Sequence, residues 1–421
     1  MPEPLLTPRS GLPLLIVDEA GFLAALAELE KGSGPIAVDA ERASGYRYSQ
    51  RAYLIQIFRR GGGLHLIDPI SVSDPQLWQK MDQSFKECEW IIHASTQDLP
   101  CLRELGIFPT KLFDTELGGR IAGCERVGLG PLCESLLDLQ LAKEHSAVDW
   151  SIRPLHEDWL NYAALDVDVL IDLRDAVENL LRDNGKLEWA LEDFAQILKN
   201  PAPPPRVDPW RRTSGMHKVR DRMTLAIIRA LWHARDDFAR SIDIAPGRIF
   251  NDEVLVEVAT KHPAKIDEFT KIIKRRTRVT NLPTTEWFDL MHRTLQLPER
   301  ELPILRTPTV GLPPVKLWKD RNPLGNARLS HARAAVVALA KELEIPVENL
   351  VSPEVIRQLV WKNPPESGLE SYIADLLETH GARRWQIEQI TPVLLEPMYA
   401  TEPIPALEPV ESSAAGEENS E

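Results

Sequence analysis

Cysteine is scarce in this sequence, and no two of its four cysteines form a Cys-x-x-Cys pair: they are Cys88, Cys101, Cys124 and Cys133. The missing pair argues against a structural zinc site. Residues 1–4 lack the basic and apolar segments of a signal peptide. We therefore expect a cytoplasmic protein whose thiols stay reduced.

Long apolar runs are missing as well. No uninterrupted apolar segment approaches the roughly 18 residues that a membrane-spanning helix needs, so we expect no membrane association. The chain also lacks a Gly-x-x-x-x-Gly-Lys-Ser/Thr phosphate loop, which argues against an attached helicase. What remains is a soluble globular composition, 43% hydrophobic and 27% charged over 421 residues, which allows two or three domains.

The net charge of −14 at first argues against a nucleic-acid partner. Binding depends on local patches rather than on the charge of the whole chain, however. A site that holds divalent cations also requires negative charge around it. The acidity is therefore compatible with a metal-dependent nuclease, but it does not indicate one.

Residues 1–200 alternate short apolar runs with helical patterns, which predicts an α/β domain. The first three of the expected strands follow one another closely, so we expect them to form an antiparallel meander. The strands are expected at 36–38, 54–58, 64–67 and 90–92. Helices are expected at 98–105, 115–122, 132–137 and, as one long helix that stops before Asn184-Gly185, at 157–182.

A proline-rich segment at 201–205 is the clearest domain boundary, because such segments are stiff and extended. After it the strand patterns fade, and an acidic tail with almost no large apolar residues predicts disorder at the end. The predicted organisation is an α/β domain followed by two all-α domains. The expected boundaries are 1–200 for the α/β domain, 201–215 for a linker, 216–282 for the first helical domain, 283–315 for a second linker, 316–398 for the second helical domain and 399–421 for the tail.

Acids in the α/β domain occur where a metal site needs them. Asp39 and Glu41 directly follow the apolar residues of 36–38, and side chains two apart on a strand project from the same face. Mg²⁺ and Mn²⁺ prefer such oxygen ligands. A solvated strand end is the ordinary alternative, because Asp-x-Glu is a common pattern.

Two further patterns add an aromatic hydroxyl and two more acids. Asp98 follows the strand expected at 90–92 and opens a helix, whose dipole favours an anion. Tyr162 and Asp166 lie four residues apart in the long helix and so share one face. The ordinary interpretations are a first-turn acid, a core aromatic and a surface acid, respectively. His93 suits a protein core as well as a catalytic site.

Taken together and in this order, these patterns resemble the ribonuclease D family, in the tyrosine-containing branch of the DEDD exonuclease superfamily. The resemblance runs through most of residues 15–185. Ala40 differs from the residue that the family often has between the first two acids, which matters little because it would not face a metal ion. The segments that carry the resemblance are Asp39-x-Glu41, Ala52-Tyr53-Leu54-Ile55-Gln56-Ile57, Leu66-Ile67-Asp68-Pro69, His93-x-x-x-x-Asp98-Leu99, Asp114-Thr115, Asp149-Trp150-x-x-Arg153-Pro154-Leu155 and Tyr162-Ala163-Ala164-x-Asp166-Val167.

The resemblance implies a ribonuclease H-like domain, a mixed sheet flanked by helices, that releases nucleoside 5′-monophosphates from RNA 3′ ends. It implies that two divalent ions, Mg²⁺ or Mn²⁺, are held by four acids: Asp39, Glu41, Asp98 and Asp166. Tyr162 would orient the attacking water. The implied role is processing of tRNA or other stable RNA, with RNA as the partner and no obligate protein partner. Two alternatives stay open: a DNA 3′→5′ exonuclease in repair, and an RNA-binding scaffold that has lost catalysis, although the intact acids argue against the scaffold.

The first helical domain resembles the helicase-and-RNase-D C-terminal (HRDC) module, a small nucleic-acid-binding domain. This match rests on Arg229-x-x-Trp232-His233-Ala234-Arg235 and Pro246-x-x-Ile249-Phe250. The second helical domain lies where the family carries another such module. Basic residues around the first are candidate phosphate contacts, or else solvated helix faces: Arg211, Arg212, Lys274, Arg275 and Arg276. Candidates for stacking on RNA bases, with core packing as the alternative, are Tyr46, Tyr48 and Tyr53.

Overall fold

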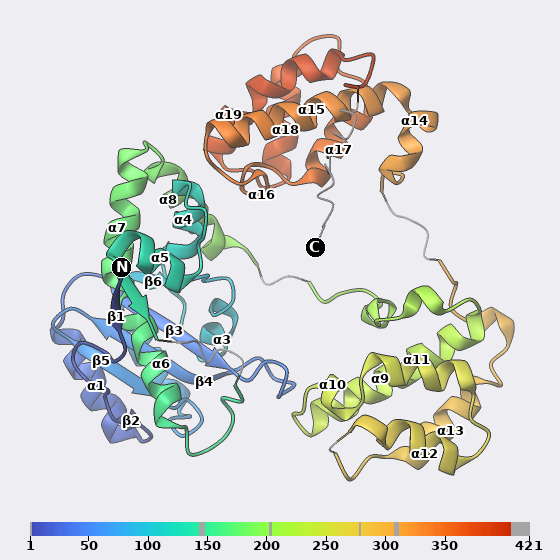
Figure 1. Ribbon diagram of the computed structural model, residues 1–421, viewed down its shortest axis with the longest axis horizontal. Helices are drawn as coiled ribbons and strands as arrows, with labels where there is room; N and C mark the ends of the chain where they lie inside the picture. Colours follow the sequence, from blue (N-terminus) through green and yellow to red (C-terminus); the bar gives the residue numbers. More distant parts are fainter. Residues whose placement is uncertain (1, 143–147, 202–203, 278, 307–310, 406–421) are drawn as a thin grey trace, which may run out of the picture. The chain divides into compact units, whose positions relative to one another are not determined.

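The computed structural model describes residues 2–142, 148–201, 204–277, 279–306 and 311–405. The chain divides into two compact units, Met1–Pro308 and Thr309–Glu421. The first unit contains an α/β domain followed by helices, and the described residues of the second form helices only (Figure 1). Among the described residues, no helix is long and apolar enough to cross a membrane.

A six-stranded mixed sheet forms the centre of the α/β domain, in the order β2-β5-β4-β3-β6-β7. The predicted antiparallel meander is confirmed by β3, β4 and β5, whereas β6 pairs in parallel with both β3 and β7. A separate parallel pair joins β1 to β8. The strands are β1 (Glu3–Leu5), β2 (Leu15–Ile16), β3 (Ile36–Arg42), β4 (Ala52–Arg59), β5 (Gly63–Ile67), β6 (Glu89–Ile92), β7 (Lys111–Asp114) and β8 (Leu139–Leu141).

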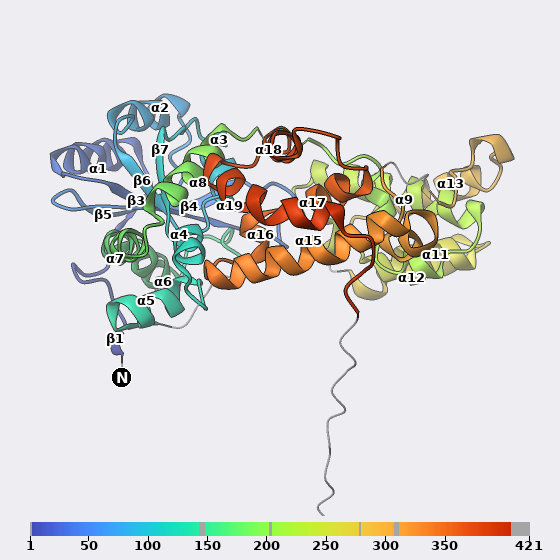
Figure 2. The same cartoon turned by 90° about the horizontal axis from the view of Figure 1, so that it is seen from above.

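Helices cover both faces of this sheet, with α1 and α2 on one side and α6 and α7 on the other (Figure 2). The first helix shows how the sequence specifies such a layer. Asp18 caps it by accepting a hydrogen bond from the Gly21 amide at 2.7 Å, and Phe22, Leu26 and Leu29 recur at helical spacing and are buried. The helices of this domain are α1 (Glu19–Lys31), α2 (Pro75–Ser84), α3 (Leu99–Glu104), α4 (Thr115–Ala122), α5 (Leu129–Leu137), α6 (Glu157–Asp168), α7 (Leu170–Asp183) and α8 (Leu187–Lys199).

The prediction of one long helix at 157–182 is wrong, because the structure divides it at Val169 into α6 and α7. Val169 is completely buried, so the division lies inside the core rather than at the surface. No glycine or proline marks it in the sequence. The predicted stop is confirmed, since α7 ends at Asp183, and Gly185 then adopts a positive φ of 68°.

The helices that complete the first unit share one apolar core, and this core corrects both predicted linkers. Trp210, within the predicted linker 201–215, is buried in it, as are Trp287 and Met291 from the predicted linker 283–315. The bulky apolar side chains of these proline-rich segments pack on α9 instead of facing water. The elements are η1 (Pro209–Arg212), η2 (Met216–Lys218), α9 (Arg222–Ser241), α10 (Pro246–Ile249), α11 (Asp252–Lys261), α12 (Ile266–Ile273), η3 (Lys274–Arg276), α13 (Thr284–Thr294) and η4 (Glu299–Glu301).

The second unit packs its helices around buried Trp318 and Trp385. Residues at the start of the predicted tail contact α15, where the Ile404 amide donates to Ser330 Oγ at 2.8 Å. Residues 406–421 lie outside the described residues, so the disorder predicted for them stays a prediction. The elements are η5 (Val315–Leu317), α14 (Trp318–Arg321), α15 (Pro323–Glu342), α16 (Val347–Leu350), α17 (Pro353–Trp361), α18 (Leu369–Thr379), α19 (Arg384–Leu395) and η6 (Glu396–Tyr399).

Candidate active site

The five residues predicted for catalysis all line a single cavity of about 700 Å³. Asp39 and Glu41 come from β3, Asp98 immediately precedes α3, and Tyr162 and Asp166 come from α6. Three segments that are far apart in the sequence therefore meet at one place. The cavity is dominated by acids, as a site for cations requires.

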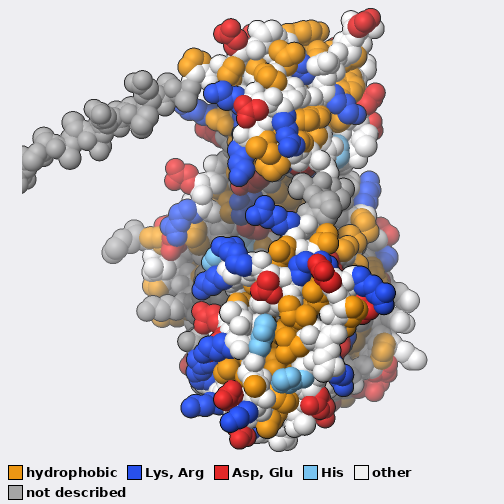
Figure 3. Space-filling view, turned by 90° about the vertical axis from the view of Figure 1, so that its right-hand side faces the viewer, with side chains coloured by type: hydrophobic (Ala, Val, Ile, Leu, Met, Phe, Trp, Pro, Cys, Tyr) orange, Lys and Arg blue, Asp and Glu red, His pale blue; other side chains and the backbone are white. Residues whose placement is uncertain are grey.

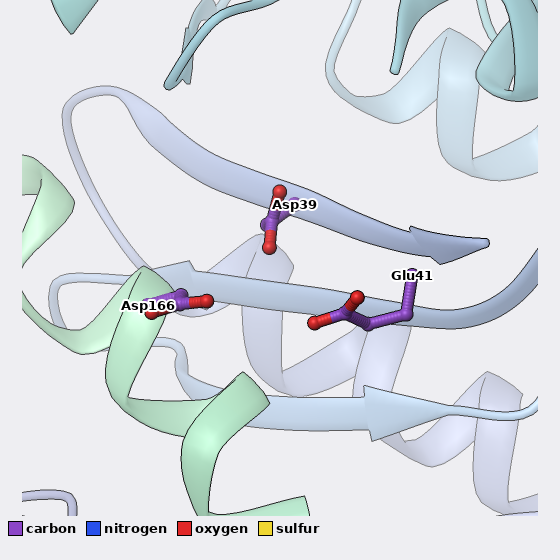
Figure 4. Close-up of side chains that lie close together, drawn as sticks. All are labelled: Asp39, Glu41 and Asp166. Carbon is purple, nitrogen blue, oxygen red and sulfur yellow. The ribbon is translucent and has the colours of Figure 1, made fainter. Parts of the chain in front are cut away.

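The carboxylates of Asp39, Glu41 and Asp166 form a compact group in which one oxygen of each lies within 4.8 Å of the others. Figure 4 shows the Glu41 and Asp166 side chains directed toward one another, with Asp39 beside them. Residues two apart on β3 share a face of the sheet, and α6 packs against that strand. Glu41 also accepts a buried hydrogen bond from Gln56 on β4, at 3.5 Å.

Burial and mutual repulsion disfavour the charged forms of these acids. Burial raises the pKa of Glu41 well above its ordinary value, and the charges of Asp39 and Asp166 raise it further. Burial also raises the pKa of Asp98 well above its ordinary value, and the charge of Asp39 adds to that rise. Asp39 and Asp98 also share a side-chain hydrogen bond, which opposes the rise in pKa of Asp39 and adds to that of Asp98. The cluster is therefore unfavourable when fully ionised, and bound cations would remove the conflict.

Tyr162 adds a neutral hydroxyl beside these acids. Burial raises the pKa of its phenol, and the neighbouring charges of Asp166 and Glu41 raise it further. The phenol also hydrogen-bonds with Asp166, one helical turn away. The side chain consequently stays protonated at neutral pH and serves as a hydrogen-bonding group rather than as a base.

Asp98 is positioned by a network that begins at Asp114, at the end of β7. The Asp114 carboxylate accepts hydrogen bonds from the Ser95 amide at 2.8 Å and from Ser95 Oγ at 2.6 Å. His93 Nδ1 lies 2.9 Å from Thr115 Oγ1, which fixes the first residue of the same loop. These contacts explain why His93 and Asp114-Thr115 accompany Asp98 in the sequence.

A second, partly buried contact joins other segments of the resemblance. Arg153 forms a two-pronged ion pair with Asp68, both distances being 2.8 Å, and it also donates to the Tyr53 carbonyl at 2.8 Å. Although burial raises the pKa of Asp68, the Arg153 guanidinium outweighs it and the net pKa is lowered. The segment that leads into α6 is thereby tied to the sheet beneath the cavity.

Comparison with known proteins bears directly on this geometry. Residues 14–182 match a family model of the 3′–5′ exonuclease domain, 224–283 match the HRDC domain and 311–398 match the 3′ to 5′ exonuclease C-terminal domain. Ribonuclease D of Gluconacetobacter diazotrophicus is 34% identical over 43% of this chain and 47% of its own length. Ribonuclease D of Escherichia coli is 26% identical over 86% of this chain and 94% of its own. The chain belongs to the ribonuclease D family.

Solved structures share the fold of this chain. A protein from Bifidobacterium adolescentis is 36% identical, with a TM-score of 0.86 over 94% of this chain and 100% of that one. Escherichia coli RNase D, at 22% identity and a TM-score of 0.61, covers 88% of this chain and 99% of its own and shares the fold. The ribonuclease H-like domain followed by helical domains is thus confirmed. The chain spans less than half of the length of the Gluconacetobacter relative.

The tyrosines considered for base stacking in this ribonuclease D-family chain take part in packing. Tyr53 is buried in the sheet. The Tyr48 hydroxyl donates to Asp236 on α9 at 3.0 Å, and the Arg248 guanidinium lies 3.8 Å from the centre of the Tyr46 ring. The loop between β3 and β4 therefore contacts α9 and α10 within the first unit, and these rings are explained by that contact.

The predicted basic contacts fall into different environments. Arg211 is held by Asp208 at 3.2 Å and lies 4.3 Å from the Trp210 ring centre, which gives it a structural role. Arg275 pairs with Glu257 at 2.7 Å while its side chain remains half exposed. Arg212 and Lys274 are exposed, and the side chain of Arg276 lies outside the described part. On the face shown in Figure 3, described Lys and Arg side chains are interspersed with acidic and apolar ones. Phosphate binding by these residues stays a prediction.

Cavity residues that sequence reasoning missed include Arg42, Gln97 and Glu134. Arg42 and Gln97 adjoin the motif acids Glu41 and Asp98, so proximity in the sequence was an available signal. Glu134 lies on α5, where no motif pointed to the cavity.

Proposed function

We propose that this chain is a metal-dependent 3′→5′ exoribonuclease. The observation that carries the proposal is the convergence of four acids, three of them buried and Asp39 partly buried, and a tyrosine on one cavity: Asp39, Glu41, Asp98, Asp166 and Tyr162. Membership of the ribonuclease D family supports it, and the similar Escherichia coli RNase D is an exoribonuclease involved in structured RNA processing. The same catalytic geometry serves RNA and DNA, so the preference for RNA rests on the family.

The residues present fit divalent cations, and we assign two ions, Mg²⁺ or Mn²⁺, to the cavity. Carboxylate oxygens are the ligands that these ions prefer, and the raised pKa values show that burial and repulsion oppose the ionised cluster. Asp39 belongs both to the group with Glu41 and Asp166 and to the hydrogen-bonded pair with Asp98. In this proposal Asp39, Glu41, Asp98 and Asp166 would together hold the ions.

When bound, a pair of cations would activate water, stabilise the pentacovalent phosphate and neutralise the leaving oxygen. The side chains of the protein position the attacking water. Tyr162, whose hydroxyl is hydrogen-bonded to Asp166, would accept a hydrogen bond from the attacking water and so orient it toward phosphorus. Attack breaks the bond from phosphorus to the 3′ oxygen, releasing the last nucleotide as a 5′-monophosphate and leaving a new 3′ hydroxyl.

RNA is the proposed partner, with tRNA or other stable RNA precursors as substrates and no obligate protein partner. The HRDC domain supports nucleic-acid binding outside the cavity, because modules of this kind bind nucleic acid. A cytoplasmic location is part of the proposal and agrees with four cysteines that are all free thiols.

The decisive experiment follows a single-stranded RNA labelled at its 5′ end, with Mg²⁺ or Mn²⁺, with EDTA and with an Asp39→Asn variant. We expect a ladder of shortened products that requires metal and disappears in the variant. A matching DNA strand tests substrate preference. DNA cut as fast as RNA would replace the proposal with a DNA exonuclease, and binding without cleavage of either would replace it with a scaffold.

A further inference from the structure

Arg42 is the single arginine or lysine among the described residues that line the cavity. It is the last residue of β3 and directly follows Glu41, so the strand that carries two acids also delivers a cation to the same site. Five acids line the same cavity: Asp39, Glu41, Asp98, Glu134 and Asp166. An arginine in such a place either balances the acids or binds something that enters the cavity.

The guanidinium of Arg42 is only loosely held by the protein. Its Nη2 lies 3.5 Å from Asp98 Oδ1 and 3.4 Å from Gln97 Oε1, longer than the roughly 2.7–2.9 Å of a strong charge-assisted hydrogen bond. Its Nε is buried and has no hydrogen-bond partner among the described residues. Buried polar atoms in native proteins are almost always paired, so an unpaired one calls for an explanation.

Arg153 shows what a structural arginine looks like in the same domain. Its three nitrogens donate to the Asp68 carboxylate and to backbone carbonyls at 2.8–2.9 Å. Arg42 instead makes two long contacts, both through Nη2, while 23% of its side chain is exposed. The difference indicates a residue prepared for a ligand.

We propose that Arg42 binds a non-bridging oxygen of the RNA phosphate in the cavity, and that it leaves Asp98 to do so. This inference rests on the proposed function. A planar guanidinium matches the geometry of two phosphate oxygens. Asp98 cannot hold Arg42 and a cation equally well, so metal binding releases the guanidinium toward the phosphate. The contact with Asp98 is thus the resting position of a substrate-binding residue.

If Arg42 only neutralised the charge of the acids, its removal would have a different effect on nucleotide binding. In both cases, removing the positive charge strengthens the attraction between the acids and a cation. Only a phosphate-binding residue also weakens the binding of a nucleotide once the cations are present. Two affinities that move in opposite directions therefore separate the two roles.

The experiment compares full-length wild type, Arg42→Gln and Arg42→Lys, with Lys111→Gln as a control that removes one exposed charge at the far end of β7. Calorimetry measures the Kd of Mn²⁺ alone and then the Kd of adenosine 5′-monophosphate at saturating Mn²⁺. For Arg42→Gln we expect Mn²⁺ to bind as tightly as in wild type or tighter, and the nucleotide to bind roughly tenfold more weakly. Arg42→Lys should recover part of the nucleotide affinity, and Lys111→Gln should match wild type.

Unchanged nucleotide affinity in Arg42→Gln would overturn the inference, as would a loss of Mn²⁺ affinity that matches the loss of nucleotide affinity. Melting curves in EDTA establish that each variant is folded. Failure of the proposed exoribonuclease function can be distinguished from failure of the proposed role of Arg42. A wild type that neither binds the nucleotide with Mn²⁺ nor shortens RNA removes the proposed function and this inference with it. A wild type that shortens RNA, beside an Arg42→Gln variant with normal nucleotide affinity, removes the inference alone.

Discussion

The carboxylate of Asp114 holds Ser95 by two hydrogen bonds, from the Ser95 amide at 2.8 Å and from its hydroxyl at 2.6 Å. The same carboxylate caps α4 by accepting from the amides of Glu116 and Leu117 at 3.0 Å. One buried acid thus fixes both the start of a helix and the loop that leads to Asp98. Asp114 is therefore a positioning residue of the site.

Replacing Asp114 with alanine should lower the free energy of unfolding by about 3 kcal/mol, because it leaves several buried donors without a partner. RNA cleavage should fall more than the loss of folded protein explains, since Asp98 loses its support. Denaturant unfolding and single-turnover cleavage measure the two effects. The control is Asp74→Ala, which removes the exposed cap of α2 and should cost about 1 kcal/mol with normal activity. Full activity in folded Asp114→Ala would contradict the positioning role.

The metal-free protein should lose stability as the pH rises. Burial raises the pKa of Glu41 above its unfolded value, so the native state binds more protons. The contribution of Glu41 is fully present below the unfolded value, roughly pH 4, and is lost as the pH rises through the folded pKa. In EDTA at pH 8, Glu41→Gln should therefore be more stable than wild type by about 1 kcal/mol or more. Thermal melts between pH 5 and pH 8 test this, and Mn²⁺ should stabilise wild type more than the variant. Equal pH profiles for the two proteins in EDTA would exclude the effect.

Tyr162→Phe should keep the fold and the metal sites but slow cleavage by about 100-fold, a typical effect of losing one well-placed hydrogen-bonding group. The ring stays in place, and only the hydroxyl that would orient water is removed. Calorimetry with Mn²⁺ and single-turnover RNA cleavage separate binding from chemistry. A variant that cleaves at the wild-type rate would assign Tyr162 to packing alone.

The loop between β3 and β4 should loosen when Asp236 is replaced by alanine. Asp236 accepts from Tyr48 at 3.0 Å and pairs with Arg240 at 2.9 Å. Limited proteolysis within residues 43–51 should become several-fold faster, because cleavage requires local opening of the backbone. Its neighbour Asp237 offers a matched control, since its side chain is 72% exposed and pairs with Arg240 at 3.3 Å. Equal cleavage in Asp236→Ala and Asp237→Ala would show that the contact does not hold the loop.

Lys274 and Arg275 should contribute to RNA binding by pairing with phosphates. Reversing both to glutamate should weaken binding at low salt and flatten the dependence of the binding constant on salt, by about one unit of slope for each phosphate that is no longer neutralised. Fluorescence anisotropy over a range of NaCl concentrations measures the slope. Arg211→Gln is the comparison, because Arg211 already pairs with Asp208 and contacts the Trp210 ring. A slope unchanged by the double reversal would show that both residues are solvated surface residues that do not bind RNA phosphates.

Much of the candidate site is predictable because its acids and its tyrosine lie in short sequence motifs. Asp39 and Glu41 lie two residues apart on a strand that the adjacent apolar residues predict. Tyr162 and Asp166 lie four residues apart, which is helical spacing. The division at Val169 is not predictable in the same way, since it depends on packing inside the core. Arg42 was not predicted, because the motif consists of acids and a single arginine next to it forms no pattern of its own.

Aromatic residues show the other limit. A tyrosine in a loop near a catalytic strand suits base stacking and packing equally well, and only the contact of Tyr48 with Asp236 distinguishes them. Trp210 and Trp287 similarly lie in proline-rich stretches that predict linkers, yet both are buried against helices from elsewhere in the chain. Local composition does not reveal such partners.

The place of β3 in the sheet divides the acids into two kinds. β3 is paired on both sides, to β4 and to β6, so its amides should be among the slowest to exchange with deuterium. Asp98 instead precedes a six-residue helix, and Asp166 lies three residues before the division at Val169. Two carboxylates are thus anchored in a strand with a partner on each side, and two are carried by helices. We expect ions of different radius to be accommodated by small displacements of α3 and α6, while the strand beneath them stays still.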